Sequence, residues 1–182
     1  MDTRTEYAYQ AFYCEENIWQ FLKTRAVQRP SNDAAVFITN QDQHVALAQQ
    51  QQGDEQGIVI WDYHVIALTY DPSPLIWDFD SRLPFPCSAT DWLQQTFAAF
   101  KGAPKIYHPI FKVCKAHLFL GEFQSDRRHM RDELNRWLKP PPEWPNIGRG
   151  HNLDDWLDLS CDKLGSLYDY DELMNQFVCA TN

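Results

Sequence analysis

The chain has 182 residues, of which 44% are hydrophobic and 23% are charged, and this composition is typical of one globular domain with a buried core. Its formal net charge is −9 and it contains no run of lysines or arginines, so we expect no binding to nucleic acid or to an anionic membrane surface. No stretch approaches the ~20 apolar residues of a membrane-spanning helix. We therefore expect a single domain over residues 1–182, whose acidic charge would suit a cationic ligand such as a free amino terminus.

The beginning of the chain and the cysteines indicate a protein of the cytoplasm or nucleus. The first ten residues, MDTRTEYAYQ, are too polar for a signal peptide. The five cysteines, at positions 14, 87, 114, 161 and 179, lack tight spacing and have apolar neighbours, which favours reduced thiols. Because there is no CxxC or HxxxH pair, we expect no metal site, and nothing in the sequence requires a cofactor.

The first predicted element is an amphipathic helix that starts after Tyr13. Apolar residues at Cys14, Ile18, Phe21 and Leu22 follow the spacing of one helical face. Cys14 begins that face, so its side chain should point into the core or into a cleft.

A strand-rich region follows the helix. Short strands are predicted over residues 34–40 and 44–49, and the run 57–70 is the most strand-like segment of the chain. After the turn DPSP, another strand is expected over residues 74–80. The glutamine-rich segment 48–57 is expected to be a solvated loop before the long strand.

The second half of the chain is predicted to be mostly helical. Residues 90–100 form a predicted helix with Thr90 as N-cap, while residues 111–120 combine strand alternation with a helix-like end and stay undecided. Four prolines should keep residues 138–147 extended. Short helices over residues 152–159 and 170–177 close the chain. The order of elements predicts an α+β fold.

A histidine and two aspartates should meet on one face of the predicted hairpin. His64, Asp78 and Asp80 all occupy even positions, and side chains alternate between the faces of a strand. With a turn centred near residues 72 and 73, paired residue numbers sum to about 144–146. A sum of 144 places His64 opposite Asp80 and diagonal to Asp78, and neighbours of either kind can interact.

Each of these residues also has a structural explanation. A lone cysteine on an apolar helix face is more often a core residue, and a lone strand histidine is more often structural than catalytic. Asp78 is harder to explain in this way, because it stands between Trp77 and Phe79 and a carboxylate among aromatics needs a partner. The residues alone leave both interpretations of Cys14, His64 and Asp78 open.

The chain order Cys, His, Asp, with 50 residues from Cys14 to His64, is far tighter than the roughly 130–150 residues between cysteine and histidine in papain-like enzymes. It is closer to the transglutaminase-like order. Several uncommon motifs point further, and they occur in the order YCEENIW (13–19), WDYHV (61–65), LPFPC (83–87), SDRRHM (125–130), PPPEWP (140–145) and NLDDWL (152–157). Together they resemble the protein N-terminal glutamine amidohydrolase family, also called WDYHV-motif proteins, over about residues 13–177.

The resemblance implies a monomeric α-β-α sandwich related to transglutaminase-like and papain-like cysteine enzymes. It implies hydrolysis of the side-chain amide of an N-terminal glutamine to glutamate and ammonia, a reaction that feeds the N-degron route of protein degradation. By the family motifs, Cys14 would be the nucleophile, His64 the base and Asp78 the carboxylate that orients it. The substrate is then the N-terminal glutamine of proteins and peptides, and no cofactor is implied.

Two other functions stay open at this stage. A peptidase or transamidase could use the same three residues, and a non-catalytic module could bind N-terminal residues without them. Three carboxylates are candidates for holding a substrate ammonium group, namely Glu15, Glu16 and Asp62, and the sequence does not choose among them. The backbone N–H of Cys14, at the helix start, is a natural oxyanion donor.

Overall fold

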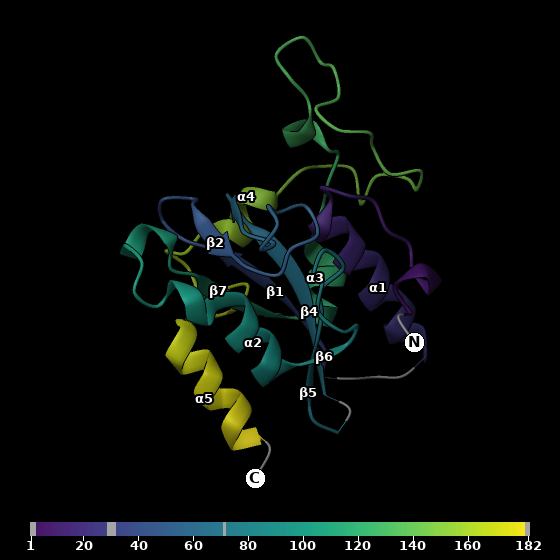
Figure 1. Ribbon diagram of the computed structural model, residues 1–182. Coiled ribbons are helices and arrows are strands. Elements are labelled where there is room, and N and C mark those ends of the chain that lie inside the picture. The colour runs from purple at the N-terminus through teal and green to yellow at the C-terminus, as the bar shows by residue number, and fades with distance from the viewer. Residues whose placement is uncertain (1–2, 29–31, 71, 181–182) are drawn as a thin grey trace.

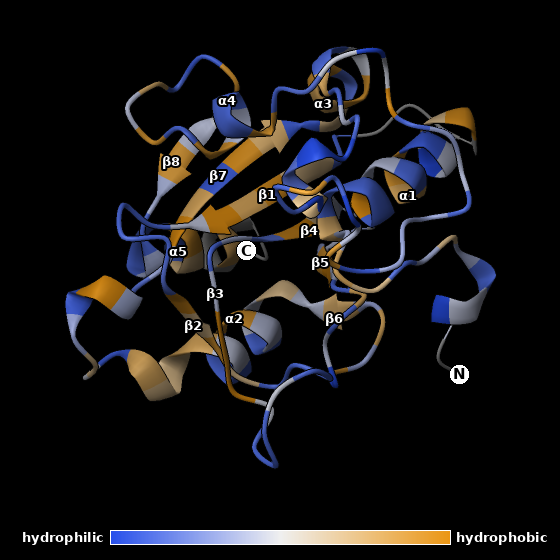
Figure 2. Ribbon diagram, turned by 90° about the horizontal axis from the view of Figure 1, so that it is seen from above, coloured by the Kyte–Doolittle hydropathy of each residue, from blue (hydrophilic) through white to orange (hydrophobic). Residues whose placement is uncertain are grey.

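The computed structural model describes residues 3–28, 32–70 and 72–180, and its centre is an antiparallel sheet of six strands in the order β6-β5-β4-β1-β7-β8 (Figure 1). Its strands are β1 (Ala34–Thr39), β4 (His64–Tyr70), β5 (Pro74–Trp77), β6 (Cys87–Ser88), β7 (Ile110–Lys115) and β8 (Ser166–Tyr168). A second, two-stranded sheet pairs β2 (Val45–Leu47) with β3 (Val59–Trp61). Figure 2 shows the hydrophobic residues of β1, β4 and β7 in the middle of the molecule.

Helices cover both faces of the six-stranded sheet. On one face Ala35 and Phe37 of β1 share a core with α1, α3 and α4, and on the other face Val36 and Ile38 share a core with α2 and α5. This division follows from strand alternation, since every residue of β1 is buried. The helices are α1 (Cys14–Gln28), α2 (Ala89–Phe97), α3 (Ala116–Glu122), α4 (Leu153–Leu157) and α5 (Tyr170–Ala180), and the 3₁₀ turns are η1 (Arg4–Glu6), η2 (Ala98–Phe100), η3 (Lys105–Tyr107) and η4 (Arg128–Met130).

The predicted α+β class and the hairpin register are confirmed. Leu68 pairs with Ile76 and Thr69 with Leu75, so the residue numbers sum to 144. Asp71 of the predicted turn lies outside the described residues. No helix in the described ranges is long and apolar enough to cross a membrane.

Several local predictions need correction. The strand-like run 57–70 forms two strands in different sheets, because the chain turns at Asp62, whose carbonyl accepts a hydrogen bond from Thr39 Oγ1 at 2.7 Å. The undecided segment 111–120 contains both elements, the end of β7 and then α3. The N-cap of α2 is Ser88 rather than Thr90, since Ser88 Oγ accepts from the Asp91 N–H at 3.2 Å. Strand β8 was not predicted. Residues 138–147 contain no helix or strand, as expected.

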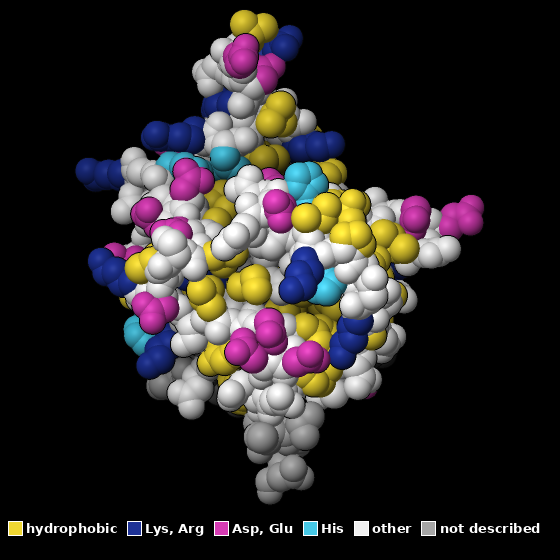
Figure 3. Space-filling model, turned by 90° about the vertical axis from the view of Figure 1, so that its left-hand side faces the viewer, with side chains coloured by type: hydrophobic (Ala, Val, Ile, Leu, Met, Phe, Trp, Pro, Cys, Tyr) yellow, Lys and Arg dark blue, Asp and Glu magenta, His cyan; other side chains and the backbone are white. Residues whose placement is uncertain are grey.

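One buried ion pair joins α1 to the segment of residues 127–144, part of which projects above the rest of the molecule in Figures 1 and 3. Arg127 donates to both carboxylate oxygens of Glu16, at 2.9 and 2.8 Å, and also to the Trp144 carbonyl. Trp144 Nε1 donates to the same Glu16 carboxylate at 2.8 Å. Both charged groups are buried, so each depends on the other for its stability in the core.

We predict that Arg127→Met lowers the free energy of unfolding by about 3–5 kcal/mol, because it leaves the Glu16 carboxylate buried without its cation. Urea denaturation measures the change. Lys101→Met is the matched control, since the Lys101–Asp171 pair is 55% and 80% exposed and such pairs contribute only ~0–1 kcal/mol. A loss below ~1 kcal/mol in Arg127→Met would contradict this role for the pair.

Candidate active site

A pocket of about 400 Å³ brings Cys14 and His64 together. Cys14 is the first residue of α1 and His64 the first residue of β4, while Asp78 directly follows β5. Because β4 and β5 are antiparallel neighbours, the start of one and the end of the other lie at the same end of the sheet. The three residues predicted from the sequence thus come from element ends in one region of the fold.

His64 and Asp78 form a buried hydrogen-bonded pair. His64 Nε2 lies 2.9 Å from Asp78 Oδ1, and the two residues are 1% and 3% exposed. Asp78 was the diagonal neighbour in the predicted register, and it is the diagonal residue that makes this bond. Asp78 Oδ2 accepts from Gln50 Nε2 at 3.3 Å and from Trp92 Nε1 at 3.1 Å, while Oδ1 also accepts from the Asp80 N–H.

These contacts shift both pKa values in the direction of an ion pair. Burial alone would raise the pKa of Asp78, but the facing His64 and the donors to the carboxylate outweigh it and lower that pKa. Burial likewise opposes protonation of His64, but the Asp78 carboxylate raises the pKa of His64 above its usual value. Because Nε2 is held by Asp78, Nδ1 is the imidazole nitrogen left to act on a nucleophile.

The Cys14 thiol is half-buried and lies in negative surroundings. Burial raises the pKa of Cys14, and the carboxylates of Glu15 and Asp80 raise it further, while the Val65 backbone N–H acts in the opposite direction. The thiol donates to Glu15 Oε2 at 3.6 Å. Cys14 therefore needs a base to become a thiolate, and His64 lines the same pocket.

The three carboxylates considered for an ammonium group have different environments. Glu16 is occupied by Arg127 and Trp144. Glu15 is fully buried, accepts from Tyr63 OH at 3.2 Å, and lies 3.4 Å from His129 Nε2. Asp62 is exposed and lines the pocket, so its carboxylate can be reached from solvent.

The glutamine-rich segment is a loop, as the sequence predicts, but it is only partly solvated: residues 51 and 54–56 are exposed, whereas residues 48, 50 and 57 are buried. Gln50 is fully buried, and its side chain supports Asp78. Gln51 Nε2 donates to the carbonyls of Phe79 and Ser81, both at 3.2 Å. Three consecutive glutamines thus hold Asp78 and the three residues that follow it, with Gln52 donating to Asp80 at 3.3 Å. Sequence reasoning missed these residues because a glutamine run carries no periodicity that separates a buried amide from a solvated one.

His64, Asp78 and Asp80 are also of the residue types that bind metal ions. One donor atom each from His64, Asp78 and Asp80 lie within 4.8 Å of one another. However, His64 Nε2 and Asp78 Oδ1 are bonded to each other, and Asp78 Oδ2 already accepts two hydrogen bonds. The donor set fits a hydrogen-bonded pair better than a metal centre, whose ligands would have to exchange these partners.

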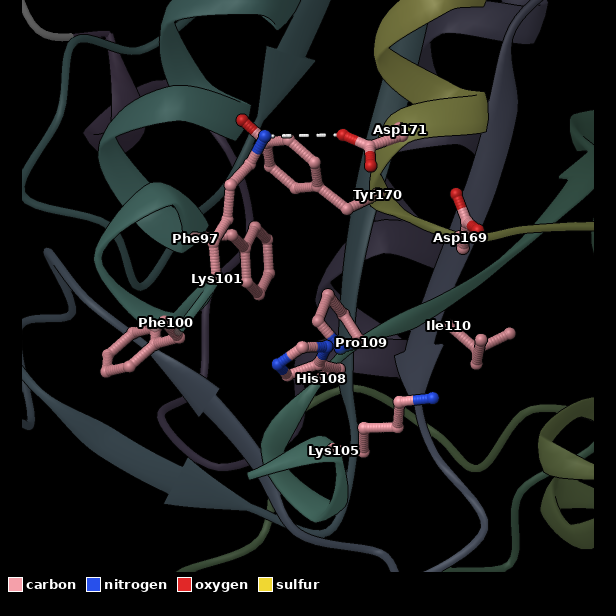
Figure 4. Close-up of a pocket in the computed structure, with 10 residues that line it drawn as sticks. All are labelled: Phe97, Phe100, Lys101, Lys105, His108, Pro109, Ile110, Asp169, Tyr170 and Asp171. Carbon is pink, nitrogen blue, oxygen red and sulfur yellow. Dashed lines mark hydrogen bonds and ion pairs between the residues drawn. The ribbon is translucent and has the colours of Figure 1, made fainter. Parts of the chain in front are cut away.

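Two pockets of the described structure are larger but differ in chemistry. One, of about 530 Å³, lies between Phe97, Lys101 and Tyr170, and Figure 4 shows Lys101 directed at Asp171, 3.2 Å away. The other, of about 550 Å³, shares Lys105 with it. Neither is lined by a cysteine, serine or threonine next to a base, so neither offers an activated nucleophile.

A cysteine that shares a pocket with a buried histidine–carboxylate pair is the arrangement of cysteine hydrolases. Comparison with known proteins is more specific. The profile of the family described as N-terminal glutamine amidase matches residues 9–177. The protein N-terminal glutamine amidohydrolase of Drosophila ananassae is 38% identical over 182 residues, which cover 93% of this chain and 88% of the relative. The proteins of the same name from Drosophila pseudoobscura pseudoobscura and Drosophila melanogaster are each 37% identical, covering 96% and 93% of this chain and 90% and 88% of the relatives. The chain belongs to the N-terminal glutamine amidase family.

We predict that Asp78→Asn lowers the pKa of His64, because burial then acts without the facing carboxylate. Folding raises the pKa of His64, so its protonation stabilises the folded protein. This contribution to the free energy of unfolding is complete below the pKa of unfolded histidine, about 6.5, and is lost as pH rises through the pKa of His64 in the folded protein. Titration of the His64 ring by NMR measures the shift in both proteins. An unchanged midpoint would show that Asp78 does not set the charge of His64.

Proposed function

We propose that this protein hydrolyses the side-chain amide of an N-terminal glutamine, giving an N-terminal glutamate and ammonia. The observation that carries the proposal is Cys14 and His64 in one pocket, with His64 bonded to Asp78 at 2.9 Å, in a chain of the N-terminal glutamine amidase family. The names of the relatives state the same activity for those proteins.

In this mechanism Cys14 attacks the carbon of the side-chain amide and His64 takes the thiol proton. The tetrahedral intermediate collapses as His64 returns that proton to the nitrogen, the C–N bond breaks and ammonia leaves. A water molecule, deprotonated by His64, then attacks the thioester, and the C–S bond breaks to give the glutamate carboxylate and the free thiol. Asp78 holds the imidazole in the required tautomer and stabilises its cationic form.

The start of α1 also contributes to this chemistry. As the first residue of the helix, Cys14 has a backbone N–H without an intrahelical partner, and this group is the proposed donor to the oxyanion. The helix N-terminus favours negative charge there by about 0.3–1 kcal/mol, which is too little to ionise a thiol whose pKa is raised by burial and by Glu15. The imidazole must therefore supply the main driving force.

Selection of an N-terminal residue requires an acceptor for its α-ammonium group. Since Glu16 is held by Arg127 and Glu15 is buried, Asp62 at the exposed rim of the pocket is the best placed of the three candidates. An ammonium held there fixes the distance to Cys14, so the site would measure the length of the substrate side chain.

The family membership supports four further parts of the proposal. The fold is related to that of transglutaminase-like and papain-like cysteine enzymes, in keeping with helices on both faces of the central sheet. The protein acts as a monomer in the cytoplasm and nucleus, and its product feeds the N-degron route. Reduced cysteines are compatible with this location, since Cys14, Cys87, Cys114 and Cys161 are free, and the side chain of Cys179 lies outside the described structure.

We predict that Cys14→Ala abolishes ammonia release while leaving the melting temperature nearly unchanged, because a half-buried residue at a helix start loses little packing.

Asp78→Asn should reduce kcat by about 100-fold or more with little change in KM, since the imidazole loses its orientation. Asp80→Asn should be milder. Ammonia release and thermal melting are the two measurements. If Asp80→Asn proved the more damaging change in kcat, the assignment of Asp78 as the orienting carboxylate would be wrong.

The substrate prediction uses four matched peptides that begin with glutamine, acetyl-glutamine or asparagine, or that carry glutamine only internally. Only the first should release ammonia rapidly. Acetylation removes the ammonium and leaves its acceptor unpaired, a loss of about 1–3 kcal/mol or more. Asparagine is shorter by one methylene, and a misplacement of ~1 Å at the amide carbon can cost ~100-fold.

Each alternative function gives a distinct result in the same assay. Comparable rates on the acetylated or internal peptide would favour a transamidase or peptidase, and an added primary amine would then be incorporated at the glutamine. Binding of the first peptide without any ammonia release would favour a recognition module.

A further inference from the structure

A second buried carboxylate, Asp80, faces the catalytic pocket and has no part in the mechanism given above. It is 3% exposed and lines the pocket together with Cys14 and His64. Its Oδ1 accepts from Tyr9 OH at 2.6 Å and from Gln52 Nε2 at 3.3 Å. Within the described part of the chain, no hydrogen bond reaches Oδ2, so this oxygen can accept one from a bound molecule.

The position of Asp80 relative to His64 decides which part of a substrate it would meet. Donor atoms of Asp80, His64 and Asp78 lie within 4.8 Å of one another, so the Asp80 carboxylate stands beside the imidazole. The leaving nitrogen of the amide must also approach the imidazole, because His64 protonates it. The α-ammonium lies at the other end of the glutamine side chain, separated from the amide carbon by three carbon atoms.

We propose that Asp80 is the residue that distinguishes a side-chain amide from a side-chain carboxylate, by accepting a hydrogen bond from the amide –NH₂ group and repelling the glutamate product. This inference rests on the proposed amidase function and deepens it. Asp80 forms no covalent bond to the substrate and takes up no proton in the reaction. Its effect is selection of the substrate and release of the product.

Two physical terms act in the same direction. An N–H bonded to a charged acceptor gives one of the stronger hydrogen bonds in a protein, and burial increases its strength. After hydrolysis a carboxylate oxygen replaces the –NH₂ group, so two carboxylates face each other in a site with little water, and this is unfavourable. A pocket with a fixed acceptor thus favours the substrate over its own product.

The hydrogen bonds to Asp80 favour the ionised form of its carboxylate against the effect of burial. Burial, with the nearby Asp78, raises the pKa of Asp80 above its usual value, and the imidazole of His64 and the donors Tyr9 and Gln52 offset this only in part. The rings of Tyr9 and Phe79 are stacked with their centroids 6.0 Å apart, which helps to hold the Tyr9 hydroxyl in place. Protonated Asp80 could donate to a carboxylate, so discrimination between amide and carboxylate should weaken as pH falls.

The test measures binding rather than turnover, so Cys14→Ala serves as the parent protein. Calorimetry gives Kd for two peptides that differ only in the first residue, glutamine or glutamate. The parent should bind the glutamine peptide about tenfold or more tightly than the glutamate peptide, as expected for a charged acceptor. Adding Asp80→Asn should bring this ratio to about one or below, because the asparagine amide can donate to the glutamate carboxylate.

Asp42→Asn in the same parent is the matched control, since it removes the same charge from an exposed residue that does not line this pocket. Its ratio should equal that of the parent. A ratio that survives Asp80→Asn would overturn the inference. So would an equal loss of affinity for both peptides, because that result would place the α-ammonium at Asp80.

Tyr9→Phe gives a second route if Asp80→Asn melts too low to measure. It removes one donor that lowers the pKa of Asp80 but keeps the ring on Phe79, so the binding ratio should decline at a higher pH than in the parent. An unchanged pH dependence would count against Asp80. The two possible failures give different results. If the amidase assignment is wrong, the wild-type protein releases no ammonia from the glutamine peptide. If only the role of Asp80 is wrong, ammonia is released but Asp80→Asn leaves the binding ratio unaltered.

Discussion

The hydrogen bond between His64 and Asp78 is the constraint to which the other parts of the site conform. A buried imidazole and a buried carboxylate are each unfavourable alone, and they are tolerated only when geometry and partners are good. The antiparallel register of β4 and β5 brings them to one end of the sheet. Because β5 ends at Trp77, Asp78 is free of ladder hydrogen bonds and can turn toward the imidazole.

The hydrogen-bond partners of Asp78 come from several separate parts of the fold. Trp92 belongs to α2 and to the core on the face of the sheet that α2 and α5 cover, and His64 is the first residue of β4. Gln50 arrives from the segment between the strands of the small sheet. Four donors, including His64, therefore converge on one carboxylate, which explains how its pKa is lowered in a place where burial alone would raise it.

The sequence predicts the parts of this arrangement that depend on local patterns. Strand parity and a two-residue turn place His64 near Asp78 and Asp80, and helical spacing places Cys14 at the start of α1. It cannot predict that Gln50 is buried, because a glutamine amide suits water and a buried carboxylate equally well and only the tertiary fold decides. The same holds for the Arg127–Glu16 pair, whose members are 111 residues apart. The N-cap of α2 is likewise Ser88 rather than the predicted Thr90, because the Ser88 side chain accepts a hydrogen bond from the Asp91 N–H.

The carboxylates around Cys14 make its thiol harder to ionise. Glu15 and Asp80 add to burial in raising the pKa of Cys14, and the first turn of α1 carries two glutamates where a helix dipole would otherwise favour a thiolate. Glu16 is paired with the Arg127 guanidinium. The positive charge that a thiolate needs must then come from His64, whose pKa is raised by Asp78 and also by Asp80 and Glu15. The negative surroundings thus disfavour an isolated thiolate, but they favour a protonated His64. The balance of these two effects, rather than the helix N-terminus alone, controls proton transfer from the Cys14 sulfur to the imidazole.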